Sequence, residues 1–437
     1  MRFLDTDEGR GPVPELVELA YGLYPGVEFF SAEYGPDDYC EWVEHSNGDP
    51  VPAPLAVYIQ DISCDRSPPV RGRDISSSRK PVTLEQELRL QGALFDADRC
   101  VQQLICAGSI VSEWTDDQLY QLVSVLEDSF ATDQNGLVNW CACVGHALPS
   151  ESRLRLLRVL GFSNLRLRIL EQIGSAAVGA QARVLDDIES LAAAARHLGM
   201  RQIGVELLFG AVHAEPCFKW LEHFVQRVQP DRIRLVDNDA ASVNGVVPNL
   251  GDTWVQTLAD LGYQHIGLDW FVHSSDLWWQ ARLARRLNWS LLGFTDMPRP
   301  DVIGIGPGAV SSIGDVYAQN ACAWDEYQKL LSRGVVPTVR GLELESDDVL
   351  RREIMVSMLT ASRIDITPIE DKWGIEFNQF FADELEYLKR FEKAGWISIK
   401  PQSIIVHGRG RRELTELCRT FDRRRRLPRD QYAPSFA

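Results

Sequence analysis

The sequence lacks any long uninterrupted apolar run and any surplus of basic residues. No stretch reaches the roughly 20 residues needed to cross a bilayer, and the acidic start does not read as a secretory signal. The net charge of −17 repels phosphate backbones. We therefore expect a cytoplasmic protein with no membrane span and no nucleic-acid partner, and we interpret the "RRRR" run at 423–426 as a solvated tail.

Metal-binding cysteine pairs are also missing. The chain has nine cysteines, but no two of them form a C-x-x-C pair. Cys141 and Cys143 alternate along a predicted strand and should share one face of it. A zinc site would need further ligands close by, and the sequence indicates none. Most of these thiols are therefore expected to be buried apolar side chains in a reducing compartment.

What the sequence does contain is a regular alternation of apolar strands and amphipathic helices after Pro54. Thr115 with Gln118 forms a capping-box pattern, and Ser150 and Gly161 bracket another helix. About seven such units predict an α/β fold with a full or partial parallel β/α barrel, whose chemistry would lie at the carboxyl ends of the strands. Its strands are predicted in "PLAVYIQDI", "VQQLICAGS", "LVNWCACV", "NLRLRIL", "IGVELLFG", "RIRLVDN" and "HIGLDWFV".

Changes in pattern divide the chain into three parts. Residues 1–50 are an irregular lead-in, 51–320 make the barrel, and 321–437 make a mainly helical, winged-helix-like domain. The glycine-rich stretch 301–320 is interpreted as a connection, and "GWISIKPQSIIVHG" as a hairpin within the last domain.

Several stretches resemble one enzyme family. "GIGPGAVSSIGDVYAQN" at 304–320, "GYQHIGLDWFV" at 262–272 and "RREIMVSMLTASRIDITPIEDKWGIEF" at 351–377 are similar to the oxygen-independent coproporphyrinogen III oxidases, radical SAM enzymes of haem synthesis. The resemblance runs from about residue 15 to about residue 425. It implies a radical SAM barrel, a [4Fe–4S] cluster, S-adenosyl-L-methionine and a tetrapyrrole substrate.

The cluster loop departs from this family. The family places three cysteines in C-x-x-x-C-x-x-C after the first strand, whereas this chain has Cys64, Pro68 and Arg71 at those positions. Proline has no ligating atom, and a guanidinium is always cationic. One remaining thiolate is a poor anchor for a cluster held by cysteines. We therefore expect neither a [4Fe–4S] cluster nor bound S-adenosyl-L-methionine, and Cys64 is a relict ligand.

The resemblance also marks a relict cosubstrate pocket. Tyr58 matches a family tyrosine, Gly108 alone survives from a G-G-G-T-P motif, and Glu206 keeps an acidic position in kind. Val310 replaces an apolar contact, while a family carboxylate of the third strand maps onto Cys143. The resemblance implies that Tyr58, Gly108, Glu206 and Val310 line the former S-adenosyl-L-methionine site.

The first hypothesis is a catalytically retired relative in haem or porphyrin metabolism. It would bind a tetrapyrrole or a partner enzyme of haem synthesis. Arg71 and Arg73 are candidate ligands for carboxylates. Ile110 and Val111, bulkier than the family's residues, are expected to fill part of the cosubstrate space.

Two other hypotheses remain open. Asp237 and Asp239 could perform acid–base chemistry of a new, non-radical kind at the barrel mouth. Alternatively, a cluster is held by recruited ligands, and the chain is a functional oxidase that decarboxylates coproporphyrinogen III to protoporphyrinogen IX. His146, in place of a family proline, is a further candidate as an axial haem ligand.

Overall fold

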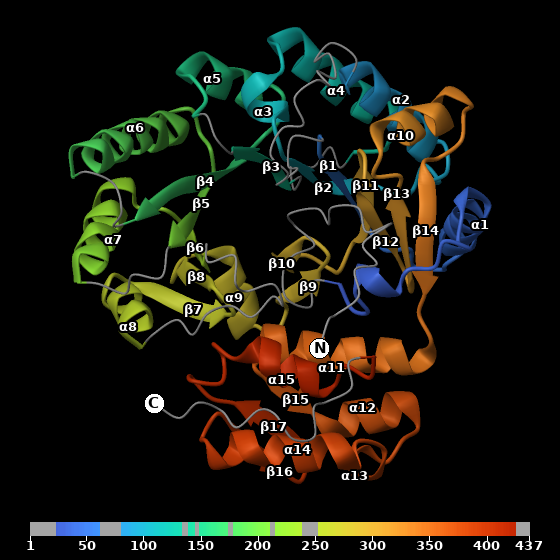
Figure 1. Ribbon diagram of the computed structural model, residues 1–437, viewed down its shortest axis with the longest axis vertical. Helices are drawn as coiled ribbons and strands as arrows, with labels where there is room; N and C mark the ends of the chain where they lie inside the picture. Colours follow the sequence, from blue (N-terminus) through green and yellow to red (C-terminus); the bar gives the residue numbers. More distant parts are fainter. Residues whose placement is uncertain are drawn as a thin grey trace, which may run out of the picture.

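The computed structural model describes residues 23–61, 80–132, 139–144, 148–173, 178–209, 215–237 and 252–424. Figure 1 shows a curved sheet ringed by helices, with a smaller helical domain beside it. The sheet has the strand order β14-β13-β12-β11-β1-β2-β3-β4-β5-β6-β8-β7. Its central strands are parallel, which confirms the predicted α/β class with a partial parallel barrel.

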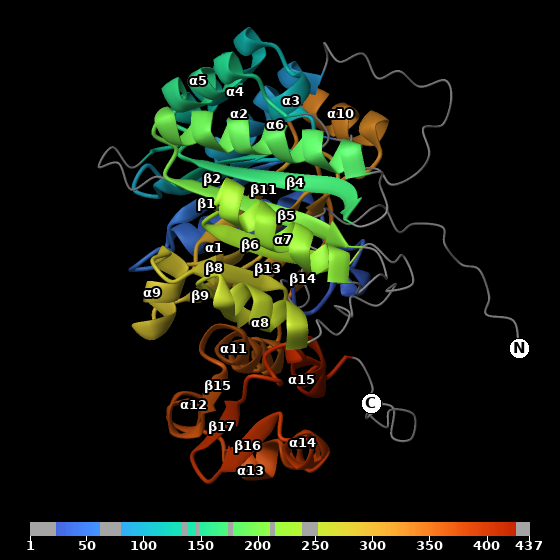
Figure 2. The same cartoon turned by 90° about the vertical axis from the view of Figure 1, so that its left-hand side faces the viewer.

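The parallel strands are β1 (Leu55–Ile59), β2 (Val101–Cys106), β3 (Asn139–Val144), β4 (Asn164–Ile173), β5 (Gln202–Phe209), β6 (Arg232–Asp237) and β11 (Asp301–Ile305). All five residues of β1 are buried, as is typical of a parallel strand covered on both faces. Figure 2 shows helices stacked along the outer side of this sheet. These are α2 (Lys80–Gly92), α4 (Asp116–Ser129), α5 (Glu151–Val159), α6 (Val178–His197), α7 (Glu215–Val228), α8 (Asp252–Asp260) and α10 (Trp324–Ser332).

The predicted caps are confirmed. The Thr115 side chain accepts a hydrogen bond from the backbone of Gln118, and the Gln118 side chain accepts one from the Thr115 backbone, which closes a capping box at the start of α4. Ser150 caps α5, and Gly161 follows its end with φ of +93°. Among the described residues, no helix is long and apolar enough to cross a membrane.

The stretch 301–320 is not a connection, and this prediction was wrong. It forms β11, β12 (Val310–Ile313) and β13 (Val316–Asn320), and β13 pairs with β14 (Thr338–Glu343). Gly306, Gly308 and Gly314 lie in the tight turns between these short strands and have positive φ, whereas Gly304 lies within β11. The sheet therefore continues past residue 320, the predicted domain boundary.

The predicted strand "HIGLDWFV" is also two strands. β7 (Tyr263–Gly267) and β8 (Trp270–His273) form an antiparallel hairpin at the end of the sheet. The chain reverses at Gly267 and Leu268, which both have positive φ. A leucine seldom adopts that conformation, so the apolar run concealed the turn.

The lead-in packs against the far end of the sheet. Its described part holds η1 (Val27–Phe29) and α1 (Pro36–Asn47). The Trp42 indole donates to the backbone oxygen of Ile313 at 2.9 Å, and Ser31 forms a bridge with Gly341. Residues 23–50 are thus held to β12 and β14.

The C-terminal domain is mainly helical, as predicted. It contains α11 (Ser346–Ala361), α12 (Ile366–Trp373), α13 (Phe377–Phe380), α14 (Ala382–Lys393) and α15 (Leu414–Thr420). The predicted hairpin is β16 (Ile397–Lys400) with β17 (Ser403–Val406), and β15 (Arg363–Asp365) completes a small sheet. Three short elements lie between barrel and domain: α9 (Leu277–Leu283), β9 (Asn288–Ser290) and β10 (Gly293–Thr295). The single turn α3 (Ile110–Glu113) follows β2.

The arginine run does not begin as a solvated tail. Arg423 and Arg424 each place two guanidinium nitrogens on the carboxylate of Asp348, with closest distances of 2.7 and 2.6 Å. Asp348 lies in the first turn of α11 and its side chain is fully buried. The two arginines outweigh the burial that would raise its pKa, and they hold that pKa at about 2. A buried carboxylate needs such partners, which corrects the prediction for these two residues.

Candidate ligand-binding site

The inner face of strands β4 to β6 carries a cluster of charged side chains. Along β4, Leu165 and Leu167 belong to the core between sheet and helices, so Arg166 and Arg168 face the barrel interior. Arg168 lies opposite Glu206 in the register of β4 and β5. Glu206 in turn lies opposite Arg234 of β6, so two cations flank one carboxylate across three strands.

Glu206 is shared by three guanidinium groups. Its carboxylate oxygens lie 4.0 Å from Arg166 Nη1, 3.9 Å from Arg168 Nε and 3.8 Å from Arg234 Nη1. Burial acts to raise the pKa of Glu206, but the charges of Arg234, Arg166 and Arg168 prevail and lower it. Glu206 therefore stays ionised because three cations surround it.

Two arginines of this face also pair with aspartates. Arg234 Nε lies 2.8 Å from Asp269, and Arg232 Nε lies 2.9 Å from Asp276. The Arg232 guanidinium also lies 3.5 Å from the centroid of the Trp278 ring. We use the name arginine cluster for Arg166, Arg168, Arg232 and Arg234, which together face Glu206, Asp269 and Asp276. Among the described residues, Asp296 also acts on Arg232, and guanidinium groups gathered in this way can bind an anionic ligand.

Cys141 and Cys143 of β3 share the inner face, which confirms the predicted alternation. Cys141 belongs to the inner apolar cluster with Tyr58, and Cys143 packs against it. Arg166 lies opposite Cys143 in the register of β3 and β4. A hydrogen bond with Cys143 lowers the pKa of the Cys141 thiol to about 7, with help from Arg166 and Arg232 and against the effect of burial. The pKa of Cys143 is raised, first by that same bond.

Two of the predicted cosubstrate residues, Tyr58 and Val310, lie in the same inner cluster. The Tyr58 hydroxyl donates to Gln60 Oε1 at 3.0 Å, and the Gln60 amide donates to the backbone oxygen of Pro307 at 3.0 Å. These two bonds tie β1 to the glycine-rich turn after β11. Glu206 lies instead in contact with the arginine cluster, on strands further around the barrel.

Gly108 faces Asp61 at the ends of β1 and β2. Gly108 has φ of +75°, and a Cβ atom there would lie 2.3 Å from Asp61 Oδ1. The Asp61 carboxylate accepts hydrogen bonds from the Ser109 backbone at 2.9 Å and from its hydroxyl. The space beside this glycine is therefore taken by a side chain of the protein.

The expectation for Ile110 and Val111 was wrong. Both are fully buried, but they belong to the large core between sheet and helices and not to the inner cluster around Tyr58. Because α3 turns immediately after Ser109, these side chains point away from the barrel interior. They do not fill the cosubstrate space.

Other predicted site residues lie outside the described residues: Cys64, Arg71, Arg73, Asp239 and His146. Asp237 ends β6, opposite Phe209 of β5. The arginine cluster was not predicted, although a signal for it exists. In "NLRLRIL" and "RIRLVD", arginine and apolar residues alternate, which marks strands with one charged face.

A second buried carboxyl group lies behind the glycine-rich turn. Glu87 of α2 is completely buried and accepts hydrogen bonds from the Gly306 backbone at 2.8 Å, from Asn320 at 2.7 Å and from the Tyr327 hydroxyl. These donors are neutral, so burial prevails and raises the pKa of Glu87 to about 8. This group secures the turn and does not face the arginine cluster.

The donor set for an iron–sulfur cluster does not fit the family's pattern. The loop after β1 supplies one thiolate, from Cys64, beside Pro68 and Arg71. Within the described ranges, which leave out residues 62–79, no three His, Cys, Asp or Glu side chains gather as metal ligands. The guanidinium groups described above can bind anions.

Comparisons with known proteins agree with this architecture. No family model matches the chain. The oxygen-independent coproporphyrinogen III oxidase of Escherichia coli K12 is 26% identical over 431 residues, which cover 92% of each chain. The enzyme of Salmonella typhimurium is 27% identical over 361 residues (78% of this chain and 77% of that one), and that of Pseudomonas aeruginosa is 26% identical over 430 residues (92% of each).

A solved structure shows the same fold. Coproporphyrinogen III oxidase (HemN) from Escherichia coli, described as a radical SAM enzyme, matches with a TM-score of 0.78 and 24% identity, covering 92% of this chain and 96% of that chain. The fold is thus that of a radical SAM barrel enzyme. By sequence, the chain is a divergent homologue of the oxygen-independent coproporphyrinogen III oxidases.

Proposed function

We propose that this chain is a cluster-free homologue of the coproporphyrinogen III oxidases that binds an anionic tetrapyrrole in its barrel without oxidising it. The proposal rests on two features of the barrel: the loss of cluster-binding cysteines and the presence of guanidinium groups on its inner face. The loop that would hold the cluster has one cysteine, while the inner face of β4 to β6 gathers four guanidinium groups.

The proposed class of ligand rests on the positive charge of the arginines and on the sequence relatives. The relatives are named for coproporphyrinogen III, a tetrapyrrole with carboxylate side chains. Guanidinium groups bind carboxylates through paired hydrogen bonds. Arg168 is a candidate to make such a contact, because it faces the barrel interior and its guanidinium belongs to the group around Glu206. A ligand carboxylate could compete with Glu206 for this guanidinium group.

Glu206 would set the strength of this binding. Its ionised carboxylate offsets part of the charge of Arg166, Arg168 and Arg234 while no ligand is bound. Aromatic rings lie beside the cluster, with the centroid of the Trp270 ring 5.5 Å from the Arg166 guanidinium. Their fluorescence would report on a pigment bound nearby.

The ligand hypothesis is tested by titrating coproporphyrin III and haem into the full chain while following the fluorescence of its 12 tryptophans. Arg168→Gln should weaken binding at least tenfold. The matched control is Arg155→Gln, since Arg155 is 62% exposed and pairs with Glu151 in an exposed surface bridge. The double variant Arg71→Ala with Arg73→Ala tests the arginines of the loop. If no pigment binds, or if all variants bind equally, the proposal fails, and a partner enzyme should be sought by co-purification.

The absence of a cluster is tested separately. After anaerobic reconstitution with iron and sulfide, the iron content should stay far below the roughly four atoms per chain of a complete cluster. Cys64→Ala should not change it. A full complement of iron and sulfide that is lost in Cys64→Ala would instead support the functional oxidase.

A further inference from the structure

Two thiols lie side by side on the inner face of β3. Cys141 belongs to the inner apolar cluster and Cys143 packs against it, with one residue between them along the strand. Their side chains share a hydrogen bond. Two residues of a strand span roughly 6.4–6.8 Å between their Cα atoms, the upper end of the range of about 4.4–6.8 Å that a disulfide bridges. The two sulfurs are therefore placed to form a bond without a change of fold.

The surroundings of the pair favour a thiolate at Cys141. The hydrogen bond with Cys143 has the largest influence and lowers the pKa of Cys141 to about 7, and the positive charges of Arg166 and Arg232 act in the same direction. Burial and the negative charge of Glu206 oppose them. Because the thiolate is the nucleophilic form of cysteine, Cys141 is a nucleophile at neutral pH, while the same hydrogen bond raises the pKa of Cys143 and keeps its proton in place.

The strands on the other side of the pair contribute neutral groups. Cys106 ends β2 and pairs in register with Ala142. Burial and then the charge of Cys141 raise the pKa of the Cys106 thiol, so this thiol keeps its proton near pH 7. Tyr58 of β1 lies in the same inner cluster and donates its hydroxyl hydrogen to Gln60. The cations of β4 and β6 and the carboxylate of β5 are thus the charges that act on the pair.

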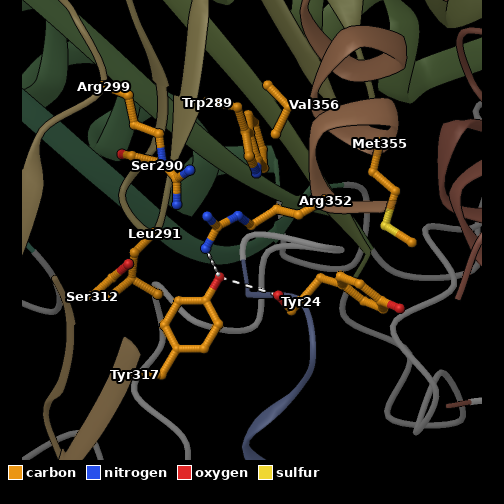
Figure 3. A pocket seen from close by; sticks show the side chains of 10 residues that line it. All are labelled: Tyr24, Trp289, Ser290, Leu291, Arg299, Ser312, Tyr317, Arg352, Met355 and Val356. Carbon is orange, nitrogen blue, oxygen red and sulfur yellow. Dashed lines mark hydrogen bonds between the residues drawn. The ribbon is translucent and has the colours of Figure 1, made fainter. Parts of the chain in front are cut away.

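Access to the pair is narrow. Cys143 is half-buried and Cys141 is 8% exposed. Figure 3 shows another edge of the same inner cluster, where Leu291 and Tyr317 line a hollow at the seam with the C-terminal domain. That hollow encloses about 10 Å³, room for one water molecule, and the Tyr317 hydroxyl is held there by a hydrogen bond from Arg352. A reagent therefore reaches the thiols from the barrel interior, through the exposed part of Cys143, and must be small.

We propose that Cys141 and Cys143 form a peroxide-sensitive dithiol that oxidises to an intramolecular disulfide. Hydrogen peroxide, which is little larger than water, is the oxidant. The Cys141 thiolate attacks one peroxide oxygen, the O–O bond breaks and hydroxide leaves, which gives a sulfenic acid at Cys141. The Cys143 thiol then loses its proton and attacks the Cys141 sulfur, so that the S–S bond forms and the S–O bond breaks with loss of water. In sum, two thiols give up two electrons and two protons, and one peroxide becomes two waters.

The disulfide formed in this way is reversible. A bridge at the upper end of the geometric range is strained, and strained disulfides are readily reduced by other thiols. The reaction uses neither Arg168 nor a bound tetrapyrrole, so it goes beyond the proposed function and does not depend on it.

The test treats the reduced full chain with hydrogen peroxide at pH 7 and follows its mass. The mass should fall by about 2 Da, for the two hydrogens lost in one disulfide, and dithiothreitol should restore it. Cleavage after Trp140 separates the pair from Cys100 and Cys106, and the bridge should map to the peptide that begins with Cys141. The rate of bridge formation should rise with pH and level off above about 7.

Three variants assign the roles of the thiols. Cys143→Ala should stop at the sulfenic acid of Cys141, which dimedone traps, and its rate should level off at a higher pH because the hydrogen bond is gone. Cys141→Ser should form no bridge. The control is Cys322→Ser, which removes another half-buried thiol with an arginine, Arg340, acting on it; burial raises the pKa of that thiol. This control should form the bridge at the rate of the parent chain.

The proposal is overturned if peroxide produces no loss of mass in the parent chain, or if oxidation stops at a sulfenic acid although Cys143 is present. It is also overturned if peroxide oxidises Cys322 of the parent chain as fast as the pair. These outcomes are read from the parent chain, so they do not depend on whether a variant folds.

Discussion

Two buried glutamates of the barrel have opposite charge states. Glu206 on β5 is 7% exposed and Glu87 on α2 is completely buried, so burial opposes ionisation at both. Glu206 has three guanidinium groups within 4.0 Å, and its pKa is lowered. Glu87 has neutral donors, and its pKa is raised to about 8. At these two sites the neighbouring groups, and not the degree of burial, decide whether the carboxyl group is ionised.

The same contrast divides the barrel into two arcs. Strands β4 to β6 present ionised groups toward the interior, whereas the side formed by β11, β13 and α2 is held by a network that contains a neutral carboxyl group. A ligand carrying negative charge is therefore expected on the first arc. The second arc is expected to be rigid and to have a structural role.

The largest expected effect concerns Glu206. Glu206→Gln leaves buried guanidinium groups without their shared carboxylate and should destabilise the chain by about 3–5 kcal/mol at pH 7. Since the folded pKa of Glu206 is lowered, its contribution is present above its unfolded pKa and is lost as the pH falls through the folded value. In urea unfolding, the difference in free energy of unfolding between the parent chain and Glu206→Gln should be smaller at acidic pH than at pH 7.

The control for that measurement is Glu151→Gln, which breaks an exposed pair with Arg155 and should cost well under about 1 kcal/mol. A Glu206→Gln variant as stable as this control would show that the arginine cluster does not need its carboxylate.

For Glu87 the expected effect is a dependence of stability on pH that is opposite in sign to that of Glu206. Its folded pKa of about 8 exceeds the ordinary value of 4.5, so its contribution is complete below pH 4.5 and is lost as the pH rises toward 8. Between pH 4.5 and pH 8, the free energy of unfolding of the parent chain should fall by up to roughly 1.4 kcal/mol per pH unit relative to that of Glu87→Gln. Unfolding curves of both proteins at several pH values measure this difference in slope. Parallel slopes would mean that Glu87 is ionised when folded.

The smallest effect is expected for Tyr327→Phe. This change removes a hydrogen bond to Glu87 and should cost about 1 kcal/mol. Because that bond favours the ionised carboxylate, its loss should also move the pH window of Glu87 upward. The shift is measured by comparing, in the parent chain and in Tyr327→Phe, the pH range over which the free energy of unfolding decreases. A downward movement would contradict the arrangement described for the second arc.

The fold was largely predictable because its signals are local. Capping residues such as Thr115 and Ser150 and the alternation of strands and helices depend on neighbours in the sequence, and the structure confirms them. The errors arose where a turn resembled something else. Gly267 and Leu268 interrupt an apolar run, while the glycines of 301–320 suggested a loop although the residues between them form strands.

The candidate site was predictable only in part. Tyr58 and Val310 meet in one inner cluster, but their role in a cosubstrate pocket stays a prediction. Ile110 and Val111 were misplaced because the direction of α3 cannot be read from residue type. The arginine cluster was missed because its members lie up to 68 positions apart, from Arg166 to Arg234, and meet only through the register of three strands.

The bond network between Asp348 and the arginines near the end of the chain has a practical consequence for protein engineering. The last described helix ends at Thr420, so a truncation chosen from helices and strands alone would discard Arg423 and Arg424. That truncated chain would retain a carboxylate in the first turn of α11 with its side chain fully buried and with both of these neutralising arginines removed. Shortened or tagged versions of the protein should therefore preserve the sequence through Arg424.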